Sequence, residues 1–140
     1  MIRSMEPSDL EAVLDIWLES NLQAHPFVPA GYWRDNLEMV REQLPRAEVY
    51  VWEEPAGIQG FLGLSGGHIE GLFVRADARS RGIGRRLLEA AKEGRDRLTL
   101  CVYEQNGGAV RFYSREGFSV ERRGIDSATG EAEFWMSWER

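Results

Sequence analysis

The chain has 140 residues, of which 43% are apolar and 11% aromatic, enough for the core of one domain but short of what two domains need. No apolar run reaches the roughly 18 residues of a membrane-spanning helix, and the first residues do not look like a secretory signal, so we expect a soluble cytoplasmic protein. Cys101 is the only cysteine, and His25 and His68 are the only histidines. This composition excludes an internal disulfide and argues against a metal site.

The net charge of −6 is unevenly distributed along the chain. Residues 1–54 carry 11 acidic residues against four arginines. A later stretch, residues 75–86, holds one acid, Asp77, and five arginines: Arg75, Arg79, Arg81, Arg85 and Arg86. A pI near 5.0 argues against a nucleic-acid partner, because nucleic-acid-binding domains commonly have a pI above ~9. The arginine cluster instead indicates one small phosphorylated ligand.

The first half of the chain predicts a short strand at residues 2–5 and two helices. Ser8 and Glu11 have the spacing of a capping box ahead of an apolar helix face. Prolines at 26 and 29 end this helix, and a second one is expected over residues 31–44. Strands are expected at 49–52 and 58–64, joined by a turn at 54–57.

The second half predicts a strand–helix–strand unit followed by a helix and a hairpin. A strand at 68–74 leads through the arginine-rich loop into a helix, and then into a continuous, buried strand at 98–103 that is parallel to the first. Asn106 can cap the next helix and Gly117 can end it. Strands at 119–124 and 131–138 form the closing hairpin. We therefore expect a single mixed α/β (α+β) domain over 1–140, in the order β-α-α-β-β-β-α-β-α-β-β.

The segment Arg79-Ser80-Arg81-Gly82-Ile83-Gly84 lies between the expected strand and helix. The first amides of a helix have no intrahelical acceptor and carry the positive end of its dipole, so they attract phosphate. Gly82 and Gly84 leave room for a pyrophosphate at those amides. The simpler alternative is a glycine-containing turn with solvated arginines. Neither the P-loop pattern nor a complete dinucleotide fingerprint is present.

This segment resembles the signature of the GNAT superfamily of acyl-CoA-dependent N-acyltransferases, a strand ending in valine followed by [RQ]-x-x-G-x-[GA]. The resemblance extends to Asn106, to Phe112-Tyr113 and to Gly117-Phe118, and it spans nearly the whole chain. His25-Pro26-Phe27 with Tyr32-Trp33 is similar to a subgroup of small bacterial acetyltransferases. The sequence departs from the family pattern in three places: Ala76 replaces a common proline, Ser80 replaces a frequent glycine, and Gly107-Gly108 is less typical.

The resemblance implies a binding site for acetyl-CoA, as co-substrate and with no metal. Amides of Arg81 to Arg85, which include Gly82, Ile83 and Gly84, would hold the pyrophosphate together with the Arg79 side chain. Backbone groups of Leu72, Phe73 and Val74 would pair with the pantetheine arm like an added strand. Asn106 would contact the same ligand, although a helix cap alone would also explain it.

Tyr113 matches the family's proton donor to the leaving thiolate, a role that suits a phenol. A buried aromatic with no catalytic role is the alternative. A lysine-like amine is neutral only about once in 2,500 at pH 7, so a base is needed. His68 and Glu70 are expected on the strand face that carries Leu72, and we rank His68 slightly ahead of Glu70 as that base. An exposed strand end would equally explain His68.

The acceptor pocket is expected between the first two helices, where the family places it. His25, Phe27, Tyr32 and Trp33 are its candidate lining, with helix packing as the alternative for Phe27 and Trp33. We expect Cys101 in the core, because it lies between two apolar residues and nothing nearby would stabilise a thiolate.

The predicted function is transfer of an acetyl group from acetyl-CoA to a primary amine, by direct attack in a ternary complex. The acceptor is an amine of a small molecule or a protein, with no nucleic-acid or membrane partner, and the enzyme is a monomer or homodimer. The alternative is a non-catalytic domain that senses CoA or binds another protein.

Overall fold

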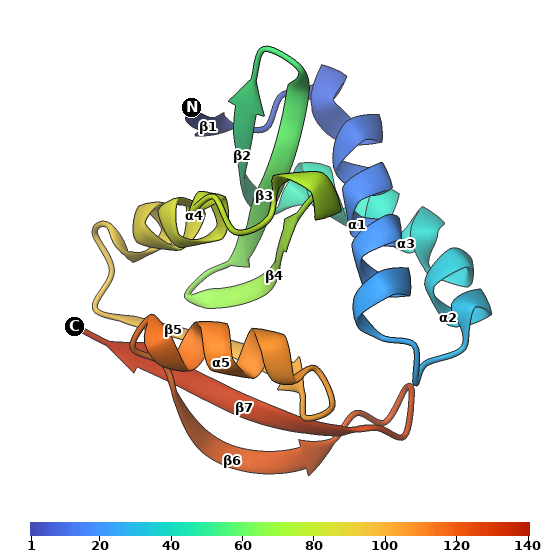
Figure 1. Ribbon diagram of the computed structural model, residues 1–140, viewed down its shortest axis with the longest axis vertical. Helices are drawn as coiled ribbons and strands as arrows, with labels where there is room; N and C mark the ends of the chain where they lie inside the picture. The colour runs from blue at the N-terminus through green and yellow to red at the C-terminus, as the bar shows by residue number, and fades with distance from the viewer.

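One seven-stranded sheet runs through the molecule, as the computed structural model of all 140 residues shows (Figure 1). Its spatial order is β1-β2-β3-β4-β5-β7-β6. Every neighbouring pair is antiparallel except β4 and β5, which are parallel. The strands are β1 (Ile2–Ser4), β2 (Glu48–Glu54), β3 (Gly57–Ser65), β4 (His68–Val74), β5 (Arg97–Tyr103), β6 (Ser119–Ile125) and β7 (Ala132–Glu139). The mixed fold class and the parallel β4–β5 pair are therefore confirmed.

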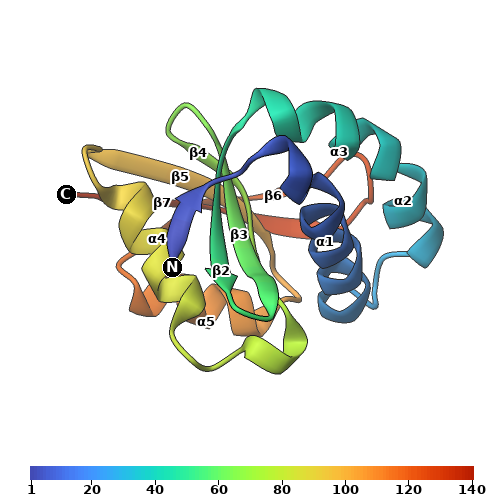
Figure 2. The same ribbon diagram turned by 90° about the horizontal axis from the view of Figure 1, so that it is seen from above.

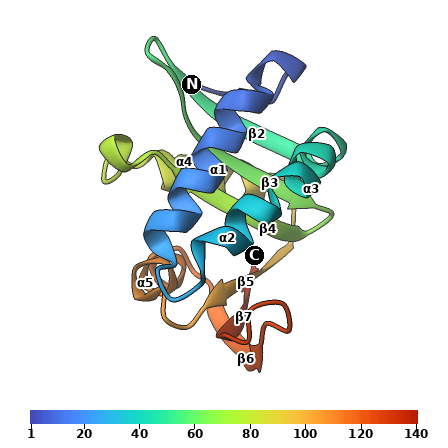
Figure 3. The same cartoon turned by 90° about the vertical axis from the view of Figure 1, so that its right-hand side faces the viewer.

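The helices are divided between the two faces of the sheet (Figures 2 and 3). On one side lie α1 (Leu10–Ala24), α2 (Ala30–Asp35) and α3 (Leu37–Gln43), and on the other α4 (Ile83–Lys92) and α5 (Gly107–Arg115). Figure 3 shows α1 lying across β2, β3 and β4. None of the helices combines the length and the apolar character needed to cross a membrane.

Burial explains why the sheet holds together in the middle. In β3, every residue from Ile58 to Leu64 is buried, as expected for a strand covered on both faces. Phe61 packs toward α1, whereas Leu62 and Leu64 pack toward α4. Two apolar cores, one on each face, thus fix β3 and its neighbour β4.

The expected helix over residues 31–44 is two helices, because the helix breaks at Asn36. Asn36 has φ −91° and ψ −2°, and its side-chain amide donates to the Tyr32 carbonyl at 2.7 Å. This local bond competes with the helical pattern. The element order therefore has three helices, not two, between β1 and β2.

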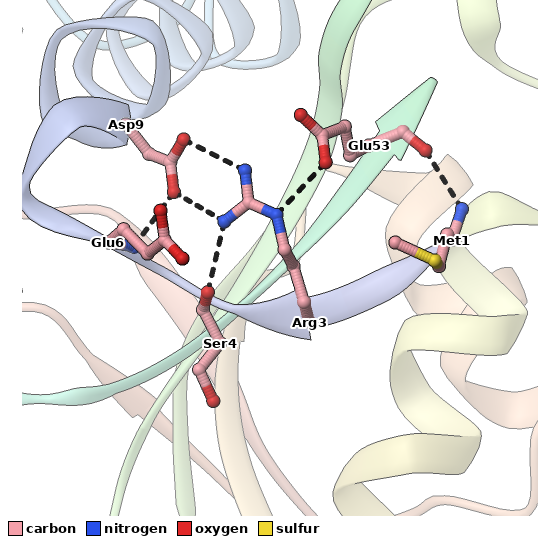
Figure 4. A network of polar contacts seen from close by, with 6 residues as sticks. All are labelled: Met1, Arg3, Ser4, Glu6, Asp9 and Glu53. Carbon is pink, nitrogen blue, oxygen red and sulfur yellow. Dashed lines mark hydrogen bonds and ion pairs between the residues drawn. The ribbon is translucent and has the colours of Figure 1, made fainter. Parts of the chain in front are cut away.

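The expected helix start at Ser8 is also displaced. A short 3₁₀ turn, Pro7–Asp9, precedes α1, and its capping box joins Glu6 to Asp9. The Asp9 carboxylate also accepts two hydrogen bonds from Arg3, at 2.7 and 3.0 Å (Figure 4). Arg3 also reaches Glu53 at the end of β2. This network ties the first strand to both α1 and β2.

The prediction of a wholly buried strand at 98–103 is wrong. In β5, Leu98, Leu100 and Val102 are buried against α4 and α5, but Cys101 on the opposite face is exposed. The helices α1 to α3 lie over β2 to β4, so that face of β5 has no such cover. Cys101 is therefore a surface residue and not part of the core.

Candidate active site

The strands β4 and β5 separate along their length. They pair only at His68 with Thr99 and at Ile69 with Leu100. Beyond that point β4 continues to pair with β3 as far as Val74, and β5 pairs with β7. The β5-facing backbone of residues 71–74 is thus left outside any ladder. An extended ligand could pair there as an added strand.

A cavity of about 640 Å³ extends from this opening to the start of α4 and along α5. We call it the arginine cavity, because Arg79, Arg85 and Arg115 line it. One acid, Glu116, also lines it, and Arg85 lies 3.8 Å from that carboxylate. The other lining residues are Leu72, Val74, Ala78, Ser80, Gly82, Ile83, Gly84, Gly108, Ala109, Phe112 and Tyr113.

The loop before α4 has the backbone geometry of an anion site. Ser80 and Gly82 have positive φ angles of 65° and 80°, and Gly82 is the N-cap of α4 with no side chain capping it. The amides of Ile83, Gly84 and Arg85 therefore lack intrahelical acceptors at the positive end of the helix dipole. A Cβ at Gly82 would meet no atom within 4 Å. The space beside these amides fits a phosphate group.

The remaining residues of the arginine-rich loop have different roles. Arg81 pairs with Glu54 at 2.9 Å and does not line the cavity. Arg86 lies over the Trp52 ring, 5.4 Å from its centre. A Cβ at Gly84 would lie 3.5 Å from the Phe112 ring, an ordinary van der Waals distance, so the packing of α4 against α5 does not itself require a glycine here.

A second cavity, of about 250 Å³, lies on the other side of the opening. We call it the carboxylate cavity, since Glu70, Asp126 and Glu133 line it and no lysine or arginine does. His25, Trp33 and Asn106 contribute further polar groups to its lining. Such a cavity favours a cationic ligand.

Tyr113 lies where the two cavities meet, together with Leu72 and Ala109. Only 8% of the Tyr113 residue is exposed, and its ring packs edge-on against Phe112 and Phe118. No residue of the chain forms a hydrogen bond with its hydroxyl. Burial raises the pKa of this phenol above its usual value of 10. The hydroxyl is thus a protonated donor with no partner in the protein.

Asn106 caps α5 and also fixes the ring of His25. Its Oδ1 accepts from the Ala109 amide at 3.3 Å, so its Nδ2 is the atom 3.2 Å from His25 Nε2. Nε2 then accepts, which assigns the ring proton to Nδ1. His25 Nδ1 is buried without a partner, and desolvation lowers the pKa of the ring to about 4. Asn106 lines the carboxylate cavity and not the arginine cavity.

The expected shared face of His68, Glu70 and Leu72 is wrong. A bulge leaves Glu70 unpaired with β3, so Ile69 and Leu72 both pack toward α4. Glu70 lines the carboxylate cavity with Tyr113, whereas His68 does not. The His68 ring instead lies 2.8 Å from Thr99 Oγ1 and packs against Trp135.

The remaining predicted site residues divide between the cavities and the packing around them. His25 and Trp33 line the carboxylate cavity. Phe27 packs edge-on against His25, and Tyr32 against Trp33, so these two rings support the lining without forming it. The Phe73 side chain faces α1, and only the backbone of Phe73 is available to a ligand in the β4–β5 opening.

Sequence reasoning missed several lining residues. Arg115 follows Phe112 by three positions in α5, a spacing that places both side chains on one helix face beside the same cavity. Asp126 and Glu133 flank the turn of the closing hairpin, and nothing in the sequence signals that this turn reaches the cavity. Figure 1 shows the β6–β7 turn close to the end of α1. Only the folded chain brings these segments together.

Comparisons with known proteins agree with this geometry. The family model for the acetyltransferase (GNAT) domain matches residues 45–120. The peptidyl-lysine N-acetyltransferase YiaC of Escherichia coli K12 is 37% identical over 140 residues, which cover 99% of this chain and 96% of YiaC. The solution structure of apo-form YjaB from Escherichia coli has a TM-score of 0.87 and 33% identity, covering 99% of this chain and 96% of that one. PaiA N-acetyltransferase from Thermoplasma acidophilum in complex with coenzyme A shares the fold, with a TM-score of 0.84, 21% identity and coverage of 100% and 98%. The chain belongs to the GNAT family of acetyltransferases.

Proposed function

We propose that this acetyltransferase acts on the ε-amine of lysine side chains in peptides or proteins. One observation carries the proposal: an arginine-lined and a carboxylate-lined cavity meet at Tyr113, in the opening between β4 and β5. Acetyl-CoA is anionic and a lysine is cationic, so each substrate has a cavity of opposite charge. The relatives YiaC and YjaB are named peptidyl-lysine N-acetyltransferases.

On the acetyl-CoA side, the pyrophosphate would lie at the amides of Ile83, Gly84 and Arg85, beside the Arg79 side chain. The pantetheine arm would follow the free edge of β4 over residues 72–74. This path brings the thioester sulfur to Tyr113, and a Leu72 or Phe73 amide would face the thioester oxygen. Such amides stabilise the charge that develops on the oxygen during the reaction.

On the amine side, the first requirement is loss of a proton. A lysine amine at pH 7 is protonated, and neutralising it costs about 4.6 kcal/mol. Glu70 is the base we propose, acting directly or through water, because it lies in the same cavity as Tyr113 and His68 does not. Asp126 and Glu133 would attract the ammonium group before it is deprotonated.

The transfer itself is then a direct attack. Once Glu70 has released the ammonium proton to solvent, the neutral amine nitrogen forms a bond to the acetyl carbon, its next proton passes to Glu70, and the carbon–sulfur bond breaks. The leaving thiolate accepts a strong hydrogen bond from the Tyr113 hydroxyl as it departs, and it takes its proton when it is released to solvent. A Cys101 acyl-enzyme is disfavoured, because desolvation of its thiol and the charge of Glu133 raise the pKa of Cys101 to about 12.

The test measures release of free CoA thiol from acetyl-CoA with a lysine peptide and with the same peptide carrying arginine in place of lysine. We expect release only with the lysine peptide, with one acetyl group added to it. Binding of CoA without acceptor-dependent release, for any amine tried, would support the non-catalytic alternative instead.

A further inference from the structure

A third cavity, of about 420 Å³, lies on the α1 side of the sheet, within the range of ~300–1,000 Å³ typical of ligand pockets. We call it the glycine-floored cavity, because Gly63 of β3 and Gly71 of β4 lie in it and pair directly across the strands. Six of its twelve lining residues are apolar, with Trp17, Leu44, Phe61 and Phe73 among them, and the charged residues Arg46 and Glu70 also line it.

Gly63 lies beside the bulge where the β3–β4 register shifts, and the space above it would admit a side chain. Its φ angle is not positive, and a Cβ there would have its nearest neighbour 4.0 Å away, at Val49. Gly63 is nonetheless buried in a central strand, where β-branched residues are usual. At Gly71 a Cβ would come within 2.6 Å of the Phe73 ring, so that glycine lets the ring lie against β4. A strand glycine marks a bulge or a place where a ligand approaches closely, and the space above Gly63 leaves room for a ligand as well as for the bulge.

The glycine-floored cavity adjoins the carboxylate cavity. Trp17, Glu70, Gly71 and Phe73 line both, so a single layer of side chains separates the two spaces. In an extended peptide, side chains two positions apart face the same way at a separation of about 7 Å. One peptide can therefore place a lysine in the carboxylate cavity and a second side chain in the neighbouring one.

We propose that the glycine-floored cavity binds an apolar side chain located two positions from the acceptor lysine. This inference rests on the proposed peptidyl-lysine activity and adds a sequence preference to it. The apolar walls favour an aliphatic side chain over a charged one. The exposed rim residues Gln43, Arg46 and Ser65 leave the entrance open to a peptide main chain.

The experiment uses seven-residue peptides with a central lysine and glycine elsewhere, into which one leucine is placed at −2, −1, +1 or +2. We expect leucine at −2 or +2 to raise kcat/KM about 10-fold or more over the all-glycine peptide, mainly through a lower KM. Leucine at −1 or +1, or glutamate at the favoured position, should give no such gain. Equal kcat/KM for all leucine positions would overturn the proposal.

The variant Gly63→Leu tests the location, because its side chain would project into the cavity. The ratio of kcat/KM between the favoured leucine peptide and the glycine peptide should fall to near one. Gly124→Leu is the matched control, since Gly124 lies on β6 with no atom within 4 Å of its Cβ position, and it should keep the wild-type ratio. A ratio unaltered in folded Gly63→Leu would refute the assignment. If no lysine peptide is acetylated while other amines are, the proposed function fails and this inference with it.

Discussion

Replacing Tyr113 by phenylalanine isolates the proton donor from the rest of the site. The change removes one hydroxyl that has no hydrogen-bond partner in the chain, and it keeps the ring contacts with Phe112 and Phe118. No buried group loses a partner, so the free energy of unfolding should change by less than ~0.5 kcal/mol. Affinity for CoA should likewise remain within about 3-fold.

The catalytic loss should be much larger. A positioned acid contributes ~10²–10⁴-fold, and we expect the lower end, about 10²-fold in kcat. A thiol has a pKa near 8.5, below that of the buried phenol, so the thiolate leaves without full protonation and gains mainly a strong hydrogen bond. Because its raised pKa keeps Tyr113 protonated throughout, the loss should be constant between pH 7 and pH 9.

The assay is steady-state release of CoA thiol, paired with thermal unfolding and calorimetric binding of CoA. A folded Tyr113→Phe enzyme with wild-type kcat would refute the role of Tyr113 as the acid. A loss of kcat matched by an equal loss of CoA affinity would show instead that the hydroxyl serves binding.

Three further predictions test other parts of the site. Glu70→Gln should lower kcat/KM at pH 7 by about 10²-fold, and its kcat/KM should recover toward the wild-type value at pH 9, where more of the amine is neutral. His68→Ala should keep the wild-type rate. The reverse result would make His68 the base. Gly82→Trp should fill the phosphate space and weaken CoA binding, measured by calorimetry, at least 10-fold relative to Gly82→Ala. Both variants place a side chain at a positive φ angle and so share a backbone strain of about 1–2 kcal/mol. Equal affinities of the two variants for CoA would contradict the phosphate site. The unfolded chain protonates His25 near pH 6.5 and the folded one only near pH 4. As the pH falls between those values, the wild-type protein should therefore lose up to about 3 kcal/mol of stability. A denaturation series showing the same loss in His25→Asn would disprove this source.

Local rules predicted the strands and the backbone geometry of the loop before α4 well. The expected strand at 68–74 has the bounds of β4, and the others differ by one or two residues at an end. The loop glycine at 82 adopts the positive φ that allows α4 to begin with free amides. These features depend on side-chain alternation and turn chemistry within a few residues, which a sequence displays directly.

The division of roles within the site could not be predicted in the same way. Glu70 faces the acceptor side only because of a bulge opposite β3, and strict alternation would have placed it with Leu72. Asn106 contacts His25 across 81 positions of the chain, and Cys101 is exposed because no helix crosses its face of β5. The positions of Glu70, Asn106 and Cys101 thus depend on which helices and strands pack together, and not on their neighbours in the sequence.

The central claim is that acetyl-CoA and the amine reach Tyr113 from opposite sides of the β4–β5 opening. A crystal structure with a CoA–lysine peptide bisubstrate ligand tests it most directly. Our account predicts the pyrophosphate at the amides of residues 83–85, the pantetheine beside β4 at residues 72–74, and the lysine in the carboxylate cavity next to Glu70. A ligand bound with its linking atoms away from Tyr113, or with the peptide entering through the arginine cavity, would contradict it.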